Sequence, residues 1–204
     1  MKKHIISAAA VVSAFAIALC GCSESNKPVS DITDASAPSE AVQPFNDYFN
    51  GFLTNDGEKV ILSTMPQTFI DEMKKTDKYD DFLAQTQDSL IPVTINAWNE
   101  KYGDDISVTF LEQVSSTQLS ADTLDLAELC YKYTYYDVNA DVEITEGYEV
   151  TYRYEIKGSA STTEGEETAC FVRVKDDSWK MISTKAETLE QYRDAEDPYN
   201  STQA

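Results

Sequence analysis

Four cysteines are the residues of this 204-residue chain best suited to covalent chemistry, and their positions divide them into two pairs. Cys20 and Cys22 stand near the N-terminus, separated by one residue, whereas Cys130 and Cys170 lie forty positions apart in the second half of the chain. A cysteine thiol is a strong nucleophile, and a pair of cysteines can form a disulfide or serve as small apolar side chains. The spacing therefore suggests a modification site at the start of the chain and a structural pair further along.

The residues before Cys22 resemble the leader and lipobox of bacterial lipoproteins. Lys2 and Lys3 open the chain, residues 5–19 are apolar and small, and Leu19-Cys20-Gly21-Cys22 follows. A charged start, an apolar run of about 7–15 residues and small residues before the cut define an export signal. The resemblance implies that residues 1–21 are a signal peptide and that its peptidase recognises Leu19 and Gly21. It also implies that the Cys22 thiol takes the lipid.

The alternative to a cleaved leader is a transmembrane anchor, but the apolar run is shorter than the roughly 20 residues that a span requires. A lipidated cysteine carries at least two acyl chains, which hold a protein stably on a membrane. We therefore expect an extracytoplasmic protein whose membrane partner is reached through the lipid on Cys22. Residues 22–41 are rich in Ser, Ala, Asp and Pro, and the sequence predicts a disordered tether there.

Cys130 and Cys170 are the two cysteines that would remain after processing and lipidation. Cys130 falls in a predicted helix and Cys170 on the inward face of a predicted strand. An even pair in an exported protein can form a disulfide, here one that would join the helix to the sheet. Free cysteines are also among the most buried residues, so two apolar thiols explain the pair equally well.

The remaining chemistry is limited, because His4 is the single histidine and would leave with the signal peptide. Catalytic Ser-His-Asp and Cys-His arrangements need an imidazole, so these hydrolase mechanisms are excluded. Zinc sites draw on histidine and thiolate, and the glycines form no phosphate-binding loop, so we expect neither a metal nor a cofactor. Residues 137–143 place oxygen ligands at alternate positions, but Val142 and Tyr148 occupy the positions where a calcium loop needs glycine and a carboxylate.

The chain is strongly acidic, with 36 Asp and Glu against 16 Lys and Arg and a formal net charge of −20. Binding to nucleic acid is driven by basic residues that neutralise phosphates, so nucleic acid is an improbable partner class. Basic proteins, cationic peptides and divalent cations are the charged partners that remain. Acidity also keeps a secreted protein soluble, which is the simpler explanation of the composition.

The first half of the chain is predicted to be helical. Val42, Phe45, Phe49 and Leu53 recur at spacings of three and four, and residues 55–57 end the run. A second short helix is expected over residues 58–65, and a third apolar patch covers residues 69–73. A longer helical pattern follows over residues 82–98, with a kink at Pro92 and an end at Gly103.

The second half is predicted to be mainly sheet. Alternation runs from Ile106 to Gln113, and a helix over residues 122–136, capped by Asp122 or Ser120, precedes the clearest strand, residues 148–157. A loop over 158–167 is expected to lead into a hairpin of strands 168–175 and 178–183, joined at residues 176–177, with Trp179 and Met181 facing inward. Residues 185–204 are predicted to be a polar tail with at most one weak helix.

This order of elements resembles the nuclear-transport-factor-2-like (cystatin-like) superfamily, above all in the final hairpin with Trp179. The resemblance covers residues 42–184 and implies an α+β domain in which N-terminal helices pack on a curved antiparallel sheet to form a cone. The helix over residues 122–136 departs from that order. Many proteins of this kind are bacterial lipoproteins of unknown function, and the fold itself hosts many functions.

Two functions follow as hypotheses. The first is a non-enzymatic module that binds a small ligand, a peptide or a partner protein. The second is a histidine-free isomerase-like enzyme, as in the ketosteroid isomerases of that superfamily, using a buried carboxylate and a tyrosine. Tyrosines are enriched in this region and suit either an amphipathic pocket or a packed interior: Tyr131, Tyr133, Tyr135, Tyr136, Tyr148, Tyr152 and Tyr154.

Overall fold

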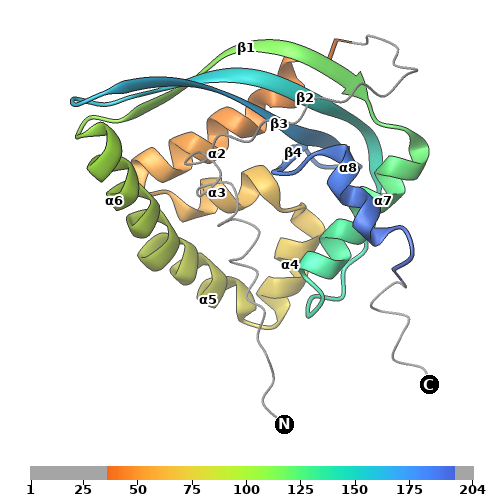
Figure 1. Cartoon of the computed structure of the whole chain (residues 1–204). Helices are drawn as coiled ribbons and strands as arrows, with labels where there is room; N and C mark the ends of the chain where they lie inside the picture. Colours follow the sequence, from red (N-terminus) through yellow and green to blue (C-terminus); the bar gives the residue numbers. More distant parts are fainter. Residues whose placement is uncertain (1–35, 196–204) are drawn as a thin grey trace.

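The computed structural model describes residues 36–195, in which helices cover one antiparallel sheet (Figure 1). The elements in chain order are η1 (Ser39–Val42), α2 (Gln43–Thr54), α3 (Gly57–Thr64), α4 (Gln67–Lys75), α5 (Lys78–Gln85), η2 (Thr86–Leu90), α6 (Ile91–Tyr102), β1 (Ser107–Gln118), α7 (Ala121–Thr134), β2 (Ile144–Lys157), β3 (Thr162–Val174), β4 (Trp179–Ile182), α8 (Ala186–Leu189) and η3 (Glu190–Tyr192). The predicted α+β class is therefore confirmed. The predicted signal peptide, Cys22 and the tether up to residue 35 lie outside the described residues.

The four strands form one sheet in the order β1-β2-β3-β4, and every neighbouring pair is antiparallel. Figure 1 shows the three long strands arching over α2 and α6, with α7 and α8 near one end of the sheet. Strand β2 has the strict alternation that the sequence predicts, because Tyr148, Val150, Tyr152 and Tyr154 are all buried. Its period of two places these side chains on one face of the sheet.

Strand β3 begins earlier than the sequence predicts. Residues 162–167 were expected in a loop, but they pair with β2 in a register that begins at Lys157 and Thr162, which leaves a turn of residues 158–161. The polar composition of this half of β3 reflects exposure rather than an irregular backbone. At Gly165 the Tyr154 ring of the opposite strand lies over the backbone, where a Cβ would come within 2.4 Å of the Tyr154 hydroxyl.

Strand β1 is also longer than predicted, because two irregularities hide its period. The pairing with β2 shifts between Phe110 and Glu112 and again between Gln113 and Ser115. Each shift inserts one extra residue, which is the definition of a β-bulge. The extra residues are Leu111 and Val114, and both side chains are exposed.

The helix does not break at Pro92, because a π-helical turn joins α5 to α6 without a gap. Segment η2 connects α5 to α6, and Pro92 stands in the first turn of α6. Proline cannot donate the helical hydrogen bond to the residue four positions earlier, so a helix that continues through it must widen or bend. Gly103 ends α6 with φ at 83°, a conformation that glycine adopts readily.

The interior consists of two apolar clusters. One joins aromatic residues of α2 and α6 to the sheet, including Phe45, Phe49 and Trp98. The other joins α4, α5 and α7 to residues such as Cys170 and Val172 of β3. Packing also extends beyond residues 42–184, since Ala37 before η1 and Leu189 in α8 are buried, and Leu189 belongs to the second cluster.

Candidate functional site

A groove of about 730 Å³ lies where the N-terminal turns of α2, helix α3 and the hairpin of β3 and β4 meet. Its apolar residues are Pro44, Leu62 and Trp179. Leu62 is 38% exposed, whereas Val60 and Ile61 beside it in α3 are buried. A partly open cavity of this volume, with an apolar part and a few polar groups, is the usual form of a ligand site.

Charged side chains surround the apolar part of this groove. The acidic residues are Glu40, Asp47, Asp56, Glu58 and Asp177, and the basic residues are Lys59, Arg173 and Lys180. Several of the acids have partners. Asp56 accepts the Lys59 backbone amide at 3.0 Å, which caps α3. Asp47 accepts the Gln43 side-chain amide at 3.4 Å, and Glu58 accepts the Tyr79 hydroxyl at 3.5 Å. The lining is therefore amphipathic, with an excess of carboxylates.

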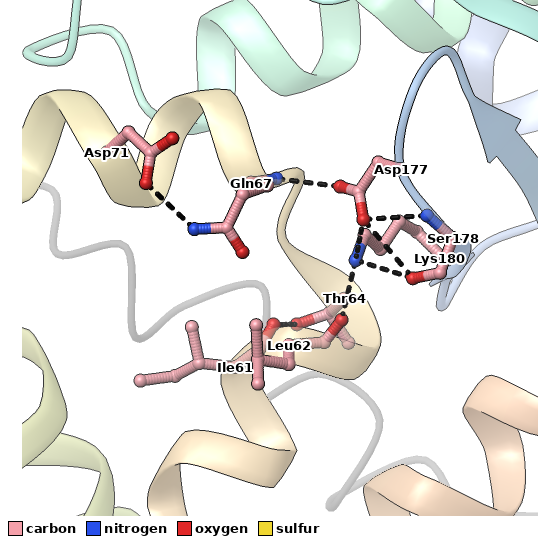
Figure 2. A network of polar contacts seen from close by, with 8 residues as sticks. All are labelled: Ile61, Leu62, Thr64, Gln67, Asp71, Asp177, Ser178 and Lys180. Atoms are coloured by element: carbon pink, nitrogen blue, oxygen red, sulfur yellow. Dashed lines mark hydrogen bonds and ion pairs between the residues drawn. The ribbon is translucent and has the colours of Figure 1, made fainter.

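The wall formed by the hairpin is held by a buried ion pair (Figure 2). The Lys180 side chain is 2% exposed, and its ammonium group lies 3.1 Å from Asp177 Oδ1. It also donates to the Leu62 carbonyl oxygen and the Ser178 hydroxyl, each at 3.0 Å. The three protons of the ammonium thus have three acceptors, so Lys180 joins β4 to α3 and is not left over to bind a ligand.

Asp177 completes this network on the other side. Its Oδ2 accepts the Gln67 backbone amide at 2.8 Å at the start of α4, and its Oδ1 accepts the Ser178 amide at 2.6 Å. Burial raises the pKa of the Asp177 carboxyl, but these hydrogen bonds and Lys180 outweigh it and hold the pKa below its usual value. Burial lowers the pKa of Lys180, and the nearby Asp177 opposes that effect.

Trp179 forms another part of the groove lining. Its side chain is 8% exposed, and its indole N–H has no hydrogen-bond acceptor among the described residues. A buried donor without an acceptor costs free energy, and most such donors in folded proteins have one. The indole nitrogen is itself buried, so this donor is not accessible from the groove.

The tyrosines that the sequence groups together are separated by the fold. Tyr148, Tyr152 and Tyr154 belong to the first apolar cluster, whereas Tyr131 and Tyr135 belong to the second. Of the other two, Tyr133 contacts the Tyr192 ring with centroids 5.6 Å apart, and Tyr136 is half exposed. These side chains therefore do not line one common binding face.

Tyr152 and Glu167 form the arrangement closest to the expected carboxylate and tyrosine pair. They stand opposite each other in the register of β2 and β3. Burial raises the pKa of the Glu167 carboxyl, and the buried Tyr152 hydroxyl has no hydrogen-bond partner among the described residues. The Tyr152 ring is surrounded by other rings, with centroids 5.0 Å from Phe45, 5.7 Å from Phe110 and 6.1 Å from Phe171.

Cys130 and Cys170 are both buried free thiols in the second apolar cluster. Burial raises the pKa of both thiols, so both remain protonated at neutral pH. Cys130 also lines a small internal cavity of about 20 Å³, together with Tyr131, whose hydroxyl has no hydrogen-bond partner among residues 36–195. The fold thus brings the two cysteines into one cluster, and whether they become oxidised in the cell stays a prediction.

The acidic segment at residues 137–143 is engaged with lysines from three other parts of the fold. Asp137 lies 3.2 Å from Lys78, Asp141 lies 3.7 Å from Lys132, and Glu143 lies 2.7 Å from Lys175. Carboxylates that each face a separate lysine do not converge on one ion. Among the described residues, no group of three or more His, Cys, Asp or Glu side chains is arranged to hold a metal.

Leu19, Gly21 and Cys22, the predicted processing and lipidation residues, lie outside the described residues. Within residues 36–195, none of the helices combines the length and the apolar character needed to span a membrane.

Sequence reasoning missed the groove and its ion pair. In β4 it predicted that Trp179 and Met181 face inward, which is confirmed, but alternation then places Lys180 outside. Lys180 is instead buried, because α3 covers the other side of this edge strand. A lysine in a short strand carries no signal of burial, so only the tertiary structure could reveal it.

Comparisons of this chain with protein-family models, with curated proteins and with solved structures find no match.

Proposed function

We propose that this chain is a membrane-anchored extracytoplasmic lipoprotein that acts as a non-enzymatic binding module. The anchor is the lipid on Cys22, and the binding site is the groove between α2, α3 and the β3–β4 hairpin. The observation that carries the binding role is the groove itself, with its exposed Leu62, its charged lining and a wall held by the Lys180–Asp177 pair. Rigid walls around an amphipathic cavity favour binding, because little order must be gained when the ligand arrives.

We also propose that the domain is a member of the nuclear-transport-factor-2-like superfamily. Two features support this assignment. Helices lie beneath an arched antiparallel sheet, and the chain closes that sheet with a hairpin that contains Trp179 (Figure 1). Helix α7, which stands between β1 and β2, is the feature that the superfamily order does not account for.

An isomerase-like enzyme that uses Glu167 and Tyr152 is the alternative function. Its support is the raised pKa of Glu167 opposite a buried tyrosine hydroxyl. However, Phe45, Phe110 and Phe171 pack around the Tyr152 ring, and neither the groove nor the small cavity beside Cys130 is lined by Tyr152 or Glu167. The binding module is therefore the better supported function.

A screen of small fragments and short peptides against the full-length protein in detergent tests the binding role. We expect ligands whose binding is lost in Leu62→Ser, which changes the apolar part of the groove. Val93→Ser is the matched control, because Val93 is 68% exposed on α6 and does not line the groove. Ligands that bind both variants equally, or a screen without ligands, would count against the groove as a binding site.

Substitution of Tyr152 by Phe separates the two functions. In a binding module this change removes a buried hydroxyl that has no partner, so the free energy of unfolding should stay equal or rise by about 1 kcal/mol. Ligand binding in the groove should not change. If ligands identified in the screen were isomerised by the wild type but not by Tyr152→Phe, the enzyme would be the correct assignment.

A further inference from the structure

We infer that the groove binds a short segment of a basic protein, in which a Lys or Arg side chain stands next to an apolar side chain. This inference rests on the proposed function, because it names the ligand class of the same groove. Two properties of the groove lead to it: the sign of its charge and the position of its apolar residues.

The accessible charge of the groove is negative. Lys180 and Asp177 neutralise each other inside the wall and take no part in ligand binding. Four carboxylates then remain against two basic side chains, and these residues are Glu40, Asp47, Asp56, Glu58, Lys59 and Arg173. The whole chain carries −20, so its field also attracts cations toward the groove.

The apolar part of the groove is placed to receive a neighbouring aliphatic side chain. Leu62 projects from α3 with 38% exposure, and Pro44 and Trp179 line the same groove. An apolar contact surrounded by charges suits an amphipathic ligand, because its apolar side chains then contact the apolar residues and its charged side chains contact the opposite charges. A small inorganic cation would leave these apolar residues without a role.

Three hexapeptides, acetylated and amidated at their ends, test the inference against the full-length protein in detergent. They alternate Leu with Lys, with Ser or with Glu, and isothermal titration calorimetry measures their dissociation constants. We expect the Lys peptide to bind, the Ser peptide to bind on the order of tenfold more weakly, and the Glu peptide not to bind. Binding of the Lys peptide should weaken as salt increases, because the accessible charges lie near the surface.

Matched variants locate the binding. The double variant Glu40→Gln, Asp47→Asn should weaken the Lys peptide about tenfold, since two exposed pairs contribute up to about 1 kcal/mol each. Glu164→Gln, Glu166→Gln is the control, because it removes the same charge from exposed positions of β3 outside the groove. Leu62→Ser should weaken the binding of the Lys and Ser peptides to the same extent. Val93→Ser should leave the binding of both peptides unchanged.

Other outcomes overturn the inference. If the two double variants weaken binding of the Lys peptide equally, the peptide is attracted to the acidic surface in general and not to the groove. Tighter binding of the Glu or Ser peptide, lost in Leu62→Ser, would reject the basic ligand but keep the groove as a binding site. A dimer that Leu62→Ser dissociates would mean that a second copy occupies the groove. If none of the peptides binds, the inference is wrong, and the broader screen then decides separately whether the groove binds anything.

Discussion

At the residue scale, the Lys180–Asp177 pair is the most consequential interaction of the groove. A buried ammonium needs its acceptors, because desolvation of an unpaired charge is costly. Here Asp177 joins three segments, since it contacts Lys180 in β4, the start of α4 at Gln67 and the hairpin turn at Ser178. We expect the pair to determine the position of the hairpin against α3.

Removal of one member of this pair should therefore be worse than removal of both. Asp177→Asn leaves the buried Lys180 ammonium without a counter-charge, and we expect it to lower the free energy of unfolding by about 3 kcal/mol. The double variant Asp177→Asn, Lys180→Met should recover part of that loss. Urea denaturation of the two variants and the wild type measures the difference, and a double variant less stable than Asp177→Asn would contradict the assigned role of the pair.

The same pair predicts a pH dependence. The pKa of Asp177 is lowered in the folded state, so the unfolded state binds more protons as the solution becomes acidic. The stability that Asp177 contributes is present above its unfolded pKa of about 4 and is lost as pH falls through the folded value. The difference between wild type and Asp177→Asn should thus shrink below about pH 4. A difference that is constant down to pH 2 would show that folding does not lower the pKa of Asp177, which would contradict the assigned ion pair.

The two cysteines allow another test at this scale. Burial and the raised pKa of both thiols predict that neither Cys130 nor Cys170 reacts with iodoacetamide in the folded protein, and that both react in urea. Mass spectrometry counts the added groups. If both stay unlabelled in urea until a reductant is added, they form a disulfide in the cell, which is the other possibility that the sequence leaves open.

At the element scale, periodicity predicted the existence of helices and strands better than their ends. Helices α2, α3, α4 and α7 and strand β2 follow their apolar patterns closely, because each buries one face. The pattern failed where burial does not alternate. The exposed half of β3 has the polar composition of a loop, and the bulges conceal the length of β1. In β4 both faces are buried, because α3 covers the face opposite the sheet interior.

The groove could not be predicted for the same reason. Its residues come from three separate parts of the chain, and none of them stands in a spacing that implies a site. The acidic excess limits the expected charged partners to basic proteins, cationic peptides and divalent cations, and this stays a prediction. What the sequence lacked was the tertiary contact that buries Lys180 and leaves Leu62 exposed.

The cap of α7 offers a prediction at the element scale. The sequence allowed Asp122 or Ser120 as the cap, and the structure assigns it to Ser120, whose hydroxyl accepts the Thr123 amide at 3.2 Å. Ser120→Ala should lower the free energy of unfolding by about 1 kcal/mol. Asp122→Ala removes only a favourable charge from the first turn, so thermal denaturation should show a smaller loss for it. A larger loss for Asp122→Ala would contradict the assignment.

At the scale of the whole molecule, we propose that an acidic α+β domain is joined to a lipid on Cys22. The domain supplies a groove with fixed walls, and the lipid would keep that groove at a membrane surface. Two acyl chains are sufficient for stable anchoring, so Cys22→Ser should release the protein from the membrane without affecting the stability of residues 36–195. Cell fractionation and thermal denaturation of this variant measure the two effects.

Mass spectrometry of the N-terminal peptide from the native, membrane-extracted protein tests the central claim most directly. We predict a mature chain that begins at Cys22 and carries a diacylglyceryl group on its thiol. A chain that still begins at Met1, with an unmodified Cys22 and recovered from the soluble fraction, would contradict the proposed anchor and the location of the binding module.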